Sequence, residues 1–400
     1  MKRPALAVVA AFASFVLLAP AARAAFKVPG YELVYSYPVE TTLAEPDLRL
    51  AQDVWPEMID KAHHTLDVNE FYITPSTGEP LEPTLAAMDR AAKRGVKIRF
   101  ILEKKMVKND VDGLARLQKM PGLQLKIADW QTLTGNGIIH AKYFIVDSTR
   151  AYVGSQNFDW RSMKHVHEMG LAIDDEPVVK QVQSVFDHDW AIADSTNAAP
   201  ADNITRPAAD DSERAFLVAS PWPYDPAGVG DSETELARLI GAAKDEILVQ
   251  NLEYFPTSYG KPAHYYGAID AALRDAAIRG VKIKILVSHW GTEEPGVAGL
   301  KSLNVLPGVE ARVITIPEAS TGPIPYARVT HSKYAVFDGK TLWLGTSNWA
   351  GGYLDQSRNL EIVVKDEALA GRAAAVQKHL WDSAYTAPLD TLKTYSKPRH

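Results

Sequence analysis

The sequence predicts an α/β protein built from two similar domains, and three observations lead to this prediction. The pattern His-x-Lys-x-x-x-x-Asp occurs as "HAKYFIVD" from His140 and again, 191 residues later, as "HSKYAVFD" from His331. The segments "RAAKRGVKIRFIL" near Gly95 and "RDAAIRGVKIKILV" near Gly280 repeat with an offset of 185. In each of these two segments a helical pattern leads into an apolar strand, which indicates alternating helices and strands.

Each half opens and closes in a similar way. "MIDKAHHTLDVNEFYI" in the first half and "LIGAAKDEILVQNLEYF" in the second both read as a helix followed by a strand. Gly95 and Gly280 stand where a helix commonly ends in a left-handed residue. The halves end in "VFDHDW" and "KHLWDSAY". We therefore expect βαβ units, a mostly parallel sheet in each domain, and helices on the outside.

The first 24 residues are typical of a secretory signal peptide. Lys2 and Arg3 precede the apolar run "ALAVVAAFASFVLLAP", and Ala22-x-Ala24 provides a small-residue cleavage site before Ala25. An uncleaved anchor is the alternative, but the run is short for a membrane span, which needs about 20 apolar residues. We expect a secreted or periplasmic protein.

The remaining chain divides at a segment without apolar periodicity. Residues 193–214, "ADSTNAAPADNITRPAADDSER", are rich in Ala, Asp, Pro, Ser and Asn, which is typical of a linker. This predicts an N-terminal domain over residues 25–192 and a C-terminal domain over residues 215–400.

Charge and composition exclude several classes of function. The net charge is −6, and loss of Lys2, Arg3 and Arg23 with the signal peptide would lower it by three, to −9. Such a protein is not suited to coating long duplex DNA, because this depends on many Lys and Arg contacts to phosphate. The sequence has no cysteine, which excludes thiol catalysis, zinc–thiolate sites and redox roles.

The repeated motifs carry the side chains that phosphodiester chemistry needs. Gly154, Ser155 and Asn157 follow the first motif, and Gly345, Thr346 and Asn348 follow the second at the same spacing. Alternation along a strand places His140 and Lys142 on one face, and likewise His331 and Lys333. If the halves pack face to face about a pseudo-twofold axis, two imidazoles, two ammonium groups and two amides surround one anion. One imidazole can then attack phosphorus while the other protonates the leaving oxygen, without a metal or other cofactor.

These motifs resemble the signature of the phospholipase D superfamily, over residues 30 to 390. The stretches "VGSQNFDWRS", "IPYARVTHSKY", "LGTSNW" and "VKIKILVSHWGTEEP" are similar to the branch of lysosomal phospholipase-D-like 5′-exonucleases and their poxviral relatives. The resemblance implies two phospholipase D-type α/β/α sandwich domains in one bilobal monomer with a single shared active site. The absence of cysteine departs from the lysosomal members.

The resemblance also implies roles for individual residues. His140 corresponds to the nucleophile and His331 to the acid, although the reverse assignment stays open. Lys142, Lys333, Asn157 and Asn348 correspond to phosphate binders. Glu168 and Glu361, which lie 11 and 13 residues beyond the two asparagines, stand where the family often has a carboxylate that orients a histidine. Asp147 and Asp338 end their strands and are expected to hold the fold.

The leading hypothesis is a secreted phosphodiesterase that acts through a covalent phosphohistidine. Its expected substrate is a phospholipid head group or a single-stranded nucleic acid end, and transient contact with a membrane surface fits the first of these. A phosphatidyltransferase, in which an alcohol replaces water, is a close alternative. From a different class, a catalytically inactive scaffold could bind anionic lipid or polymer in the same cleft.

Two further features have less specific interpretations. "HVHE", from His165 to Glu168, could suggest a metal site, but the sequence offers no further ligand cluster, and a surface strand is the favoured interpretation. Several aromatic residues near the motifs are expected to pack in the core or the cleft wall, and one or two of them could stack a base or contact an acyl chain. These aromatic residues are Trp160, Trp222, Tyr254, Phe255, Tyr326, Trp349 and Tyr353.

Overall fold

The computed structural model describes residues 25–108, 110–195, 212–258 and 263–398, and it contains two nine-stranded sheets. The proposed signal peptide (residues 1–24) and residues 196–211 of the proposed linker lie outside the described residues. None of the described helices has the length and apolar character required to span a membrane.

The first sheet is formed by elements that precede residue 193. Its strands run in the order β1-β2-β11-β9-β8-β4-β6-β7, and β3 pairs with β2. The strands are β1 (Lys27–Val28), β2 (Tyr31–Ser36), β3 (Arg49–Leu50), β4 (Thr65–Glu70), β6 (Lys97–Glu103), β7 (Gln124–Ala128), β8 (Lys142–Val146), β9 (Arg150–Gly154) and β11 (Glu168–Ile173). The helices are α1 (Ala51–Asp60), α2 (Glu82–Lys93), α3 (Lys104–Val107), α4 (Val111–Gln118), α5 (Trp130–Thr134), α6 (Trp160–Lys164) and α7 (Glu176–Ile192), and β5 (Ile73–Thr74) pairs with β10 (Phe158–Asp159).

The second sheet repeats this topology. The order β12-β21-β19-β18-β14-β16-β17 matches β2-β11-β9-β8-β4-β6-β7, with β13 and β22 added at the two edges. The strands are β12 (Ala215–Ser220), β13 (Gly230–Asp231), β14 (Glu246–Asn251), β16 (Lys282–Ser288), β17 (Val309–Ile314), β18 (Tyr334–Phe337), β19 (Thr341–Gly345), β21 (Asn359–Lys365) and β22 (Thr386–Pro388). The helices are α8 (Ser232–Ala242), α9 (Ala268–Ile278), α10 (Gly296–Asn304), α11 (Glu367–Asp382) and two short 3-10 turns, η1 (Trp222–Tyr224) and η2 (His289–Thr292), and β15 (Tyr254–Ser258) pairs with β20 (Trp349–Gly351).

The sequence correctly predicts the helix–strand units, but the expectation of mostly parallel sheets is wrong. Among the long strands described, only β4, β6 and β7, and likewise β14, β16 and β17, pair parallel, because helices connect these strands. The remaining long strands pair antiparallel, and tight turns join β8 to β9 and β18 to β19. Both halves are therefore mixed α/β sheets.

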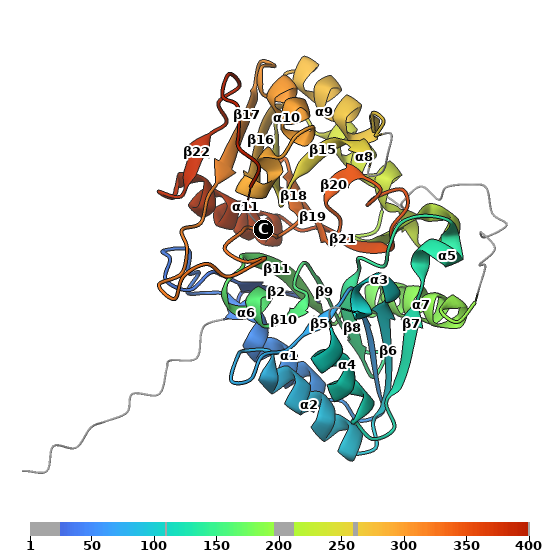
Figure 1. Ribbon diagram of the computed structural model, residues 1–400. Helices are drawn as coiled ribbons and strands as arrows, with labels where there is room; N and C mark the ends of the chain where they lie inside the picture. The colour runs from blue at the N-terminus through green and yellow to red at the C-terminus, as the bar shows by residue number, and fades with distance from the viewer. Residues whose placement is uncertain (1–24, 109, 196–211, 259–262, 399–400) are drawn as a thin grey trace, which may run out of the picture.

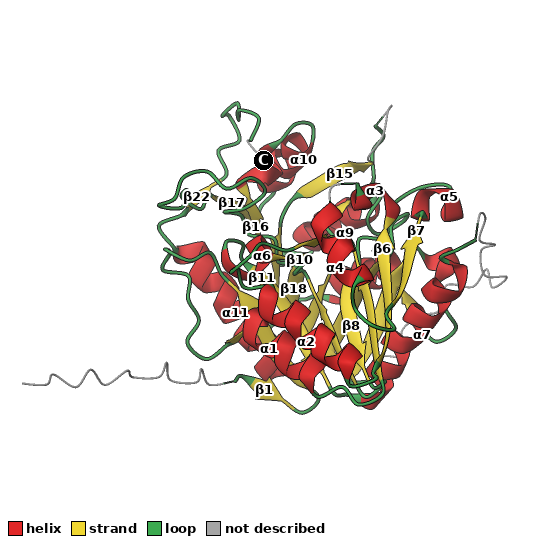
Figure 2. Cartoon of the chain, turned by 60° about the horizontal axis from the view of Figure 1, so that its bottom comes forward, coloured by secondary structure: helices red, strands yellow, loops and turns green. Residues whose placement is uncertain are grey.

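The two sheets face each other across a central layer of two helices (Figure 1). Helix α7 contacts β8, β9 and β12, so it touches both sheets, and α11 packs on β18 and β19. The inner faces of both sheets and the apolar faces of α7 and α11 form one continuous core. Helices α1 and α2 cover the outer face of the first sheet, as Figure 2 shows. A core shared in this way fixes the two halves relative to each other.

The aspartates of the two motifs hold the fold, as the sequence predicts. Asp147 and Asp338 both have positive φ, at 52° and 51°, in the turns that follow β8 and β18. The Asp147 carboxylate accepts hydrogen bonds from three successive backbone N–H groups, of residues 63 to 65, at 2.7–2.9 Å. Asp338 does the same for the N–H groups of residues 244 to 246. Each aspartate thus ties its hairpin to the start of the neighbouring strand, β4 or β14.

Candidate active site

The histidines of the two motifs are positioned by backbone contacts between the halves. His140 and His331 stand two residues before Lys142 and Lys333, and β8 begins only at Lys142. The His140 N–H donates to the Arg358 carbonyl at 2.9 Å, and the His331 N–H donates to the His167 carbonyl at 2.8 Å. Each histidine is therefore held by the strand end of the opposite half.

The side chains repeat this crossed arrangement. Nδ1 of His140 lies 2.9 Å from Oδ1 of Asn359 in the second half. Nδ1 of His331 lies 2.9 Å and 3.0 Å from the two carboxylate oxygens of Glu168 in the first half. His140 is buried, and the side chain of His331 is 13% exposed. Neither half has a complete site alone.

The orientation of the Asn359 amide fixes the tautomer of His140. Nδ2 of Asn359 donates to the Tyr353 carbonyl at 2.9 Å, and Oδ1 accepts from the Thr346 hydroxyl at 2.8 Å. The oxygen therefore faces His140, and Nδ1 of His140 must carry the proton. Nε2 of the neutral ring is then the nitrogen with a lone pair. Glu168 likewise requires a proton on Nδ1 of His331, but its carboxylate also favours the imidazolium form.

The expectation that Glu361 orients a histidine is wrong. Gly154 pairs with Gly170 in the first sheet, whereas Gly345 pairs with Glu361 in the second. The residue that corresponds to Glu168 is therefore Asn359, two positions before Glu361. The Glu361 carboxylate is instead buried and accepts hydrogen bonds from the hydroxyls of Ser347 and Ser232.

The two motif lysines are buried next to the histidines. Nζ of Lys142 donates to the His140 carbonyl, and Nζ of Lys333 donates to the His331 carbonyl at 2.6 Å. Burial lowers the pKa of Lys142 to about 7, against the opposing effect of Glu70 and Glu168. Burial also lowers the pKa of Lys333 well below its usual value. An anion that enters the site would therefore stabilise the charged form of both lysines and raise their pKa.

Burial and the two nearby lysines lower the pKa of both histidines well below 6.5. The Glu168 carboxylate opposes this effect at His331, because it contacts that ring directly. Burial raises the pKa of Glu168 to about 7. Nδ1 of His140 faces the neutral Asn359 amide instead of a carboxylate, so the neutral form is more favoured at His140 than at His331.

Both predicted asparagines line the cavity that holds the histidines. Nδ2 of Asn348 donates one hydrogen bond to Glu253 at 3.0 Å and keeps a second N–H for a ligand. Within the described residues, Oδ1 of Asn157 and Oδ1 of Asn348 have no hydrogen-bond partner. The structure thus brings Asn157 and Asn348 together with both histidines and Glu168, at one junction of the halves.

The cavity has a volume of about 680 Å³ and walls from both halves. The ring of Tyr353 packs edge-on against His140 at 4.7 Å between centroids, and Phe71 does so at 5.3 Å. Tyr326 also lines the cavity, so two of the aromatic residues singled out by the sequence reach it. Phe71, Tyr72 and Trp290 line it as well, although they were not predicted as site residues from the sequence.

The "HVHE" segment is not a surface strand, because His165 and His167 are both buried. Val166 lines the cavity, while the His167 carbonyl binds the His331 backbone and its ring lies 3.2 Å from the Ser332 hydroxyl. No group of three or more His, Asp or Glu side chains suited to a metal ion occurs among the described residues. The segment therefore supports His331 from the opposite half.

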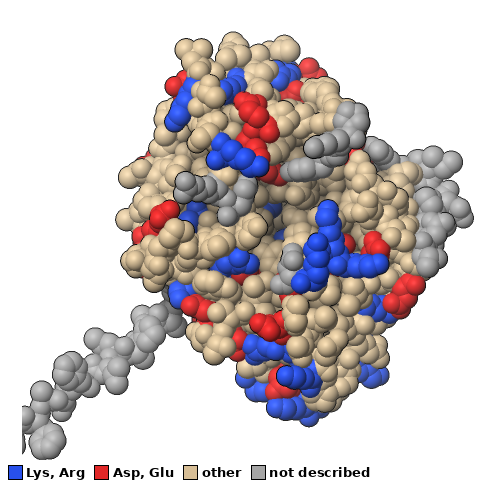
Figure 3. Space-filling model, viewed as in Figure 1, with Lys and Arg blue, Asp and Glu red and all other residues tan. Residues whose placement is uncertain are grey.

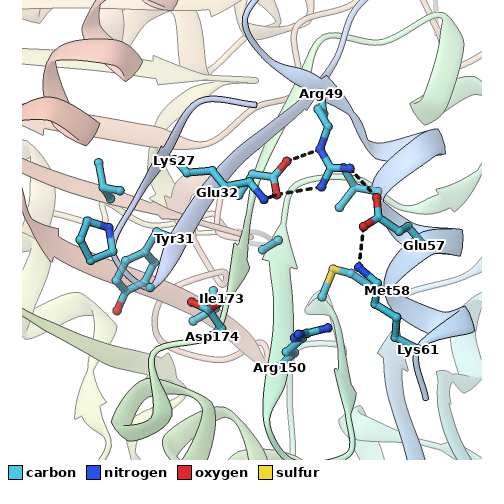
Figure 4. Close-up of a pocket in the computed structure, with 15 residues that line it drawn as sticks. Lys27, Tyr31, Glu32, Arg49, Glu57, Met58, Lys61, Arg150, Ile173 and Asp174 are labelled. Carbon is cyan, nitrogen blue, oxygen red and sulfur yellow. Dashed lines mark hydrogen bonds and ion pairs between the residues drawn. The ribbon is translucent and has the colours of Figure 1, made fainter. Parts of the chain in front are cut away.

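A smaller pocket at the N-terminal edge of the first sheet does not belong to this site (Figure 4). None of the predicted catalytic residues lines it. Several of its charged side chains pair with one another: Glu32 binds Arg49 at 2.5 Å, and Glu57 joins Arg49 to Lys61.

Three contributors to the site were not predicted from the sequence. These are the Asn359 side chain and the backbone carbonyls of Arg358 and His167. Arg358 is fully buried, and its guanidinium binds Asp189 at 3.1 Å, Asp225 at 2.5 Å and the Ser220 and Tyr224 carbonyls. The available signal for a buried charge network was an Arg directly before the Asn that begins an apolar strand.

Comparison with known proteins agrees with the repeated architecture. The family model described as "Cardiolipin synthase, PLD-like domain" matches residues 56–190 and again residues 236–381. The rat protein named 5'-3' exonuclease PLD3 is 30% identical over 378 residues, which cover 84% of this chain and 75% of the relative. Phospholipase D Z of Dictyostelium discoideum is also 30% identical, over 371 residues covering 85% of this chain and 86% of the relative.

Solved structures share the fold at low sequence identity. The phosphatidylserine synthase of Haemophilus influenzae aligns with a TM-score of 0.62 and 11% identity, over 84% of this chain and 85% of that one. The polyphosphate kinase of Porphyromonas gingivalis aligns with a TM-score of 0.56 and 12% identity, over 89% of this chain and 51% of that one. Both cover most of this chain, so the similarity includes both halves.

Proposed function

The chain belongs to the phospholipase D superfamily, and from this premise we propose that it is a phosphodiesterase that hydrolyses its substrate in two steps through a phosphohistidine on His140. The observation that carries the proposal is the asymmetry of the histidine partners. An amide oxygen holds His140 as a neutral ring, whereas a carboxylate favours the charged form of His331. One ring is thus suited to attack and the other to donate a proton.

In the first step, Nε2 of His140 forms a bond to phosphorus while the bond from phosphorus to the leaving oxygen breaks. His331 donates its Nε2 proton to that oxygen, so that an alcohol leaves. In the second step, neutral His331 takes a proton from water, the water oxygen attacks phosphorus, and the P–N bond breaks. Lys142, Lys333 and the amides of Asn157 and Asn348 stabilise the charge on the non-bridging oxygens.

Membership of the superfamily indicates a phosphodiester substrate, without specifying which kind. A phospholipid head group and a single-stranded nucleic acid end both fit a cavity that is lined by aromatic rings as well as by polar groups. We place the activity outside the cytoplasm because of the signal-like pattern in residues 1–24, and N-terminal sequencing of the exported chain would show whether it begins at Ala25.

Turnover of bis(p-nitrophenyl) phosphate tests the proposed activity. We expect release of p-nitrophenolate by the purified chain, and we expect the rate to persist in excess EDTA, because lysine and asparagine side chains neutralise the phosphate charge. A catalytically inactive scaffold would release no p-nitrophenolate. A rate that EDTA abolished and added zinc or magnesium restored would contradict the metal-independent mechanism.

The pH dependence of kcat/KM tests the assigned roles. Burial lowers the pKa of Lys142 to about 7 and that of His331 well below 6.5, so activity should fall as the pH rises through these two pKa values and the groups lose their protons. His140 stays neutral well below pH 6.5, because its pKa is lowered. We therefore expect a bell-shaped profile with its maximum on the acid side of neutrality.

Two substitutions should move opposite limbs of this profile. Glu168→Gln removes the carboxylate beside His331, lowers the pKa of that ring, and should shift the alkaline limb to lower pH by about 1–3 units. Asn359→Asp places a carboxylate beside His140, raises its pKa, and should shift the acid limb to higher pH by a similar amount.

Glu361→Gln provides a matched control, because it makes the same change in a buried carboxylate that does not contact a histidine. We expect it to leave both limbs in place. If Asn359→Asp moved the alkaline limb and Glu168→Gln the acid limb, the roles of the two histidines would be reversed.

A further inference from the structure

A second cavity lies beside the catalytic cavity and shares Tyr353 with it. Its volume is about 240 Å³, and both halves contribute to its walls. Lys105, Gln131 and Asn136 come from the first half, and Tyr353 and Gln356 come from the second. Because the Tyr353 ring packs against His140, this second cavity adjoins the nucleophile.

The walls of the second cavity are fixed by contacts between the halves. Nε1 of Trp130 donates to the Gln356 carbonyl at 3.0 Å, and the Ile138 N–H donates to the Ser357 hydroxyl at 3.3 Å. Gly137 has φ of +77°, and a Cβ atom there would lie 2.3 Å from the Gln356 carbonyl oxygen. The two backbones therefore meet too closely for any larger residue, and the cavity is formed before a ligand arrives.

The lining of the second cavity suits a polar anion. Amide side chains and backbone groups predominate in it, and Ile138 is the one aliphatic side chain among the described lining residues. An acyl chain would need an apolar channel, which this lining does not supply. Amides and an ammonium group instead match the oxygens of a phosphate and the edges of a base.

Lys105 is the one charged side chain among the described residues that line this cavity, although the whole chain carries −6. Lys104, Lys105 and Lys108 lie on or directly after the short helix α3, and all three are exposed. Lys104 pairs with Asp129 at 2.9 Å, whereas Lys105 forms no ion pair with any described residue. Figure 3 shows Lys and Arg atoms gathered beside the hollow between the lobes, at the position of α3 in Figure 1.

We propose that the second cavity is a subsite for the phosphate adjacent to the scissile one in a single-stranded nucleic acid, with Lys105 as its cation. The inference rests on the proposed function, because it assumes that the catalytic cavity cleaves a phosphodiester. It adds that the substrate is a chain with at least two phosphates, bound across Tyr353. A phospholipid such as phosphatidylcholine has one phosphodiester and would leave this subsite empty.

Kinetics of Lys105 variants on two substrates test the proposal. On a short single-stranded oligothymidylate, Lys105→Gln should raise KM about tenfold and Lys105→Glu should raise it further, because one charged hydrogen bond to phosphate is lost. The negative slope of log(kcat/KM) against log[salt] should also become shallower by roughly 0.7. On bis(p-nitrophenyl) phosphate, which has one phosphate, both variants should match the wild type.

Lys93→Gln, on the outer helix α2, is the matched control, and we expect it to leave KM unchanged for both substrates. The subsite assignment would be overturned if Lys105→Glu kept the wild-type KM for the oligonucleotide. It would also be overturned if the protein cleaved phosphatidylcholine vesicles but not the oligonucleotide. Absence of turnover on bis(p-nitrophenyl) phosphate as well would instead refute the proposed function itself, so the two failures are distinguishable.

Discussion

His140→Asn is expected to lower kcat on every phosphodiester by about 10⁴-fold or more, because the variant lacks the atom that bonds to phosphorus. Asn359 cannot replace the lost His140 ring, because its amide oxygen only accepts a hydrogen bond from Nδ1 of that ring. The rate of p-nitrophenolate release, measured at several pH values, checks this expectation.

Two controls separate a catalytic loss from a folding defect. His188→Asn, on α7 away from the cavity, should retain the wild-type rate. Thermal unfolding of His140→Asn should remain cooperative, since the His140 backbone contact to Arg358 does not involve the ring. Near wild-type turnover by His140→Asn on both a lipid and an oligonucleotide would show that the shared site has been assigned wrongly.

His331→Asn is expected to have an effect that depends on the leaving group. With an alkyl or nucleoside leaving group, loss of the proton donor should lower kcat by about 10²–10⁴-fold. With p-nitrophenolate, which leaves readily without a proton, the first step should be much less affected. The second step still needs His331 to take a proton from water, so the phosphoenzyme should accumulate.

A fast first step followed by a slow second step predicts a burst in His331→Asn of about one p-nitrophenolate per active site, and then slow steady turnover. Rapid-mixing absorbance measurements would reveal it. Equal losses on strong and weak leaving groups, with no burst, would argue that His331 does not act as the acid.

The sequence predicted the duplicated architecture well, because the repeated segments are local. Gly95 and Gly280 both end a helix with φ of +89° and +90°, as the "RGVKI" pattern indicates. The direction in which the strands pair could not be predicted from the repeated segments in the same way. Strands β8 and β9 return through a turn at Asp147, and hydrophobic alternation alone does not tell such a strand from a parallel one.

Site residues that follow directly from the motif were predicted correctly. Those whose position depends on the register of strand pairing were not. Glu168 was found, but Glu361 was chosen for the opposite half in place of Asn359. The connection between β19 and β21 places Glu361 two residues further from its asparagine than Glu168 is from Asn157. Only the pairing of Gly345 with Glu361 shows that this side chain points to Ser232 and Ser347.

Contacts between the halves were the least predictable part. The burial of His165 and His167 follows from the packing of this segment against Arg328 and Val329 of the second half, whose carbonyl and amide groups it binds. A polar sequence such as "KHVHE" therefore becomes interior only because the other half covers it.

The covalent intermediate on His140 is the central claim, and mass spectrometry of the digested protein tests it most directly. His331→Asn is mixed with bis(p-nitrophenyl) phosphate, quenched in alkali during the burst because phosphohistidine is acid-labile, and then digested. We expect a p-nitrophenyl phosphoryl adduct on the peptide that contains His140, and no adduct in His140→Asn. An unmodified His140 peptide at the height of the burst, or an adduct on the His331 peptide of His140→Asn, would contradict it.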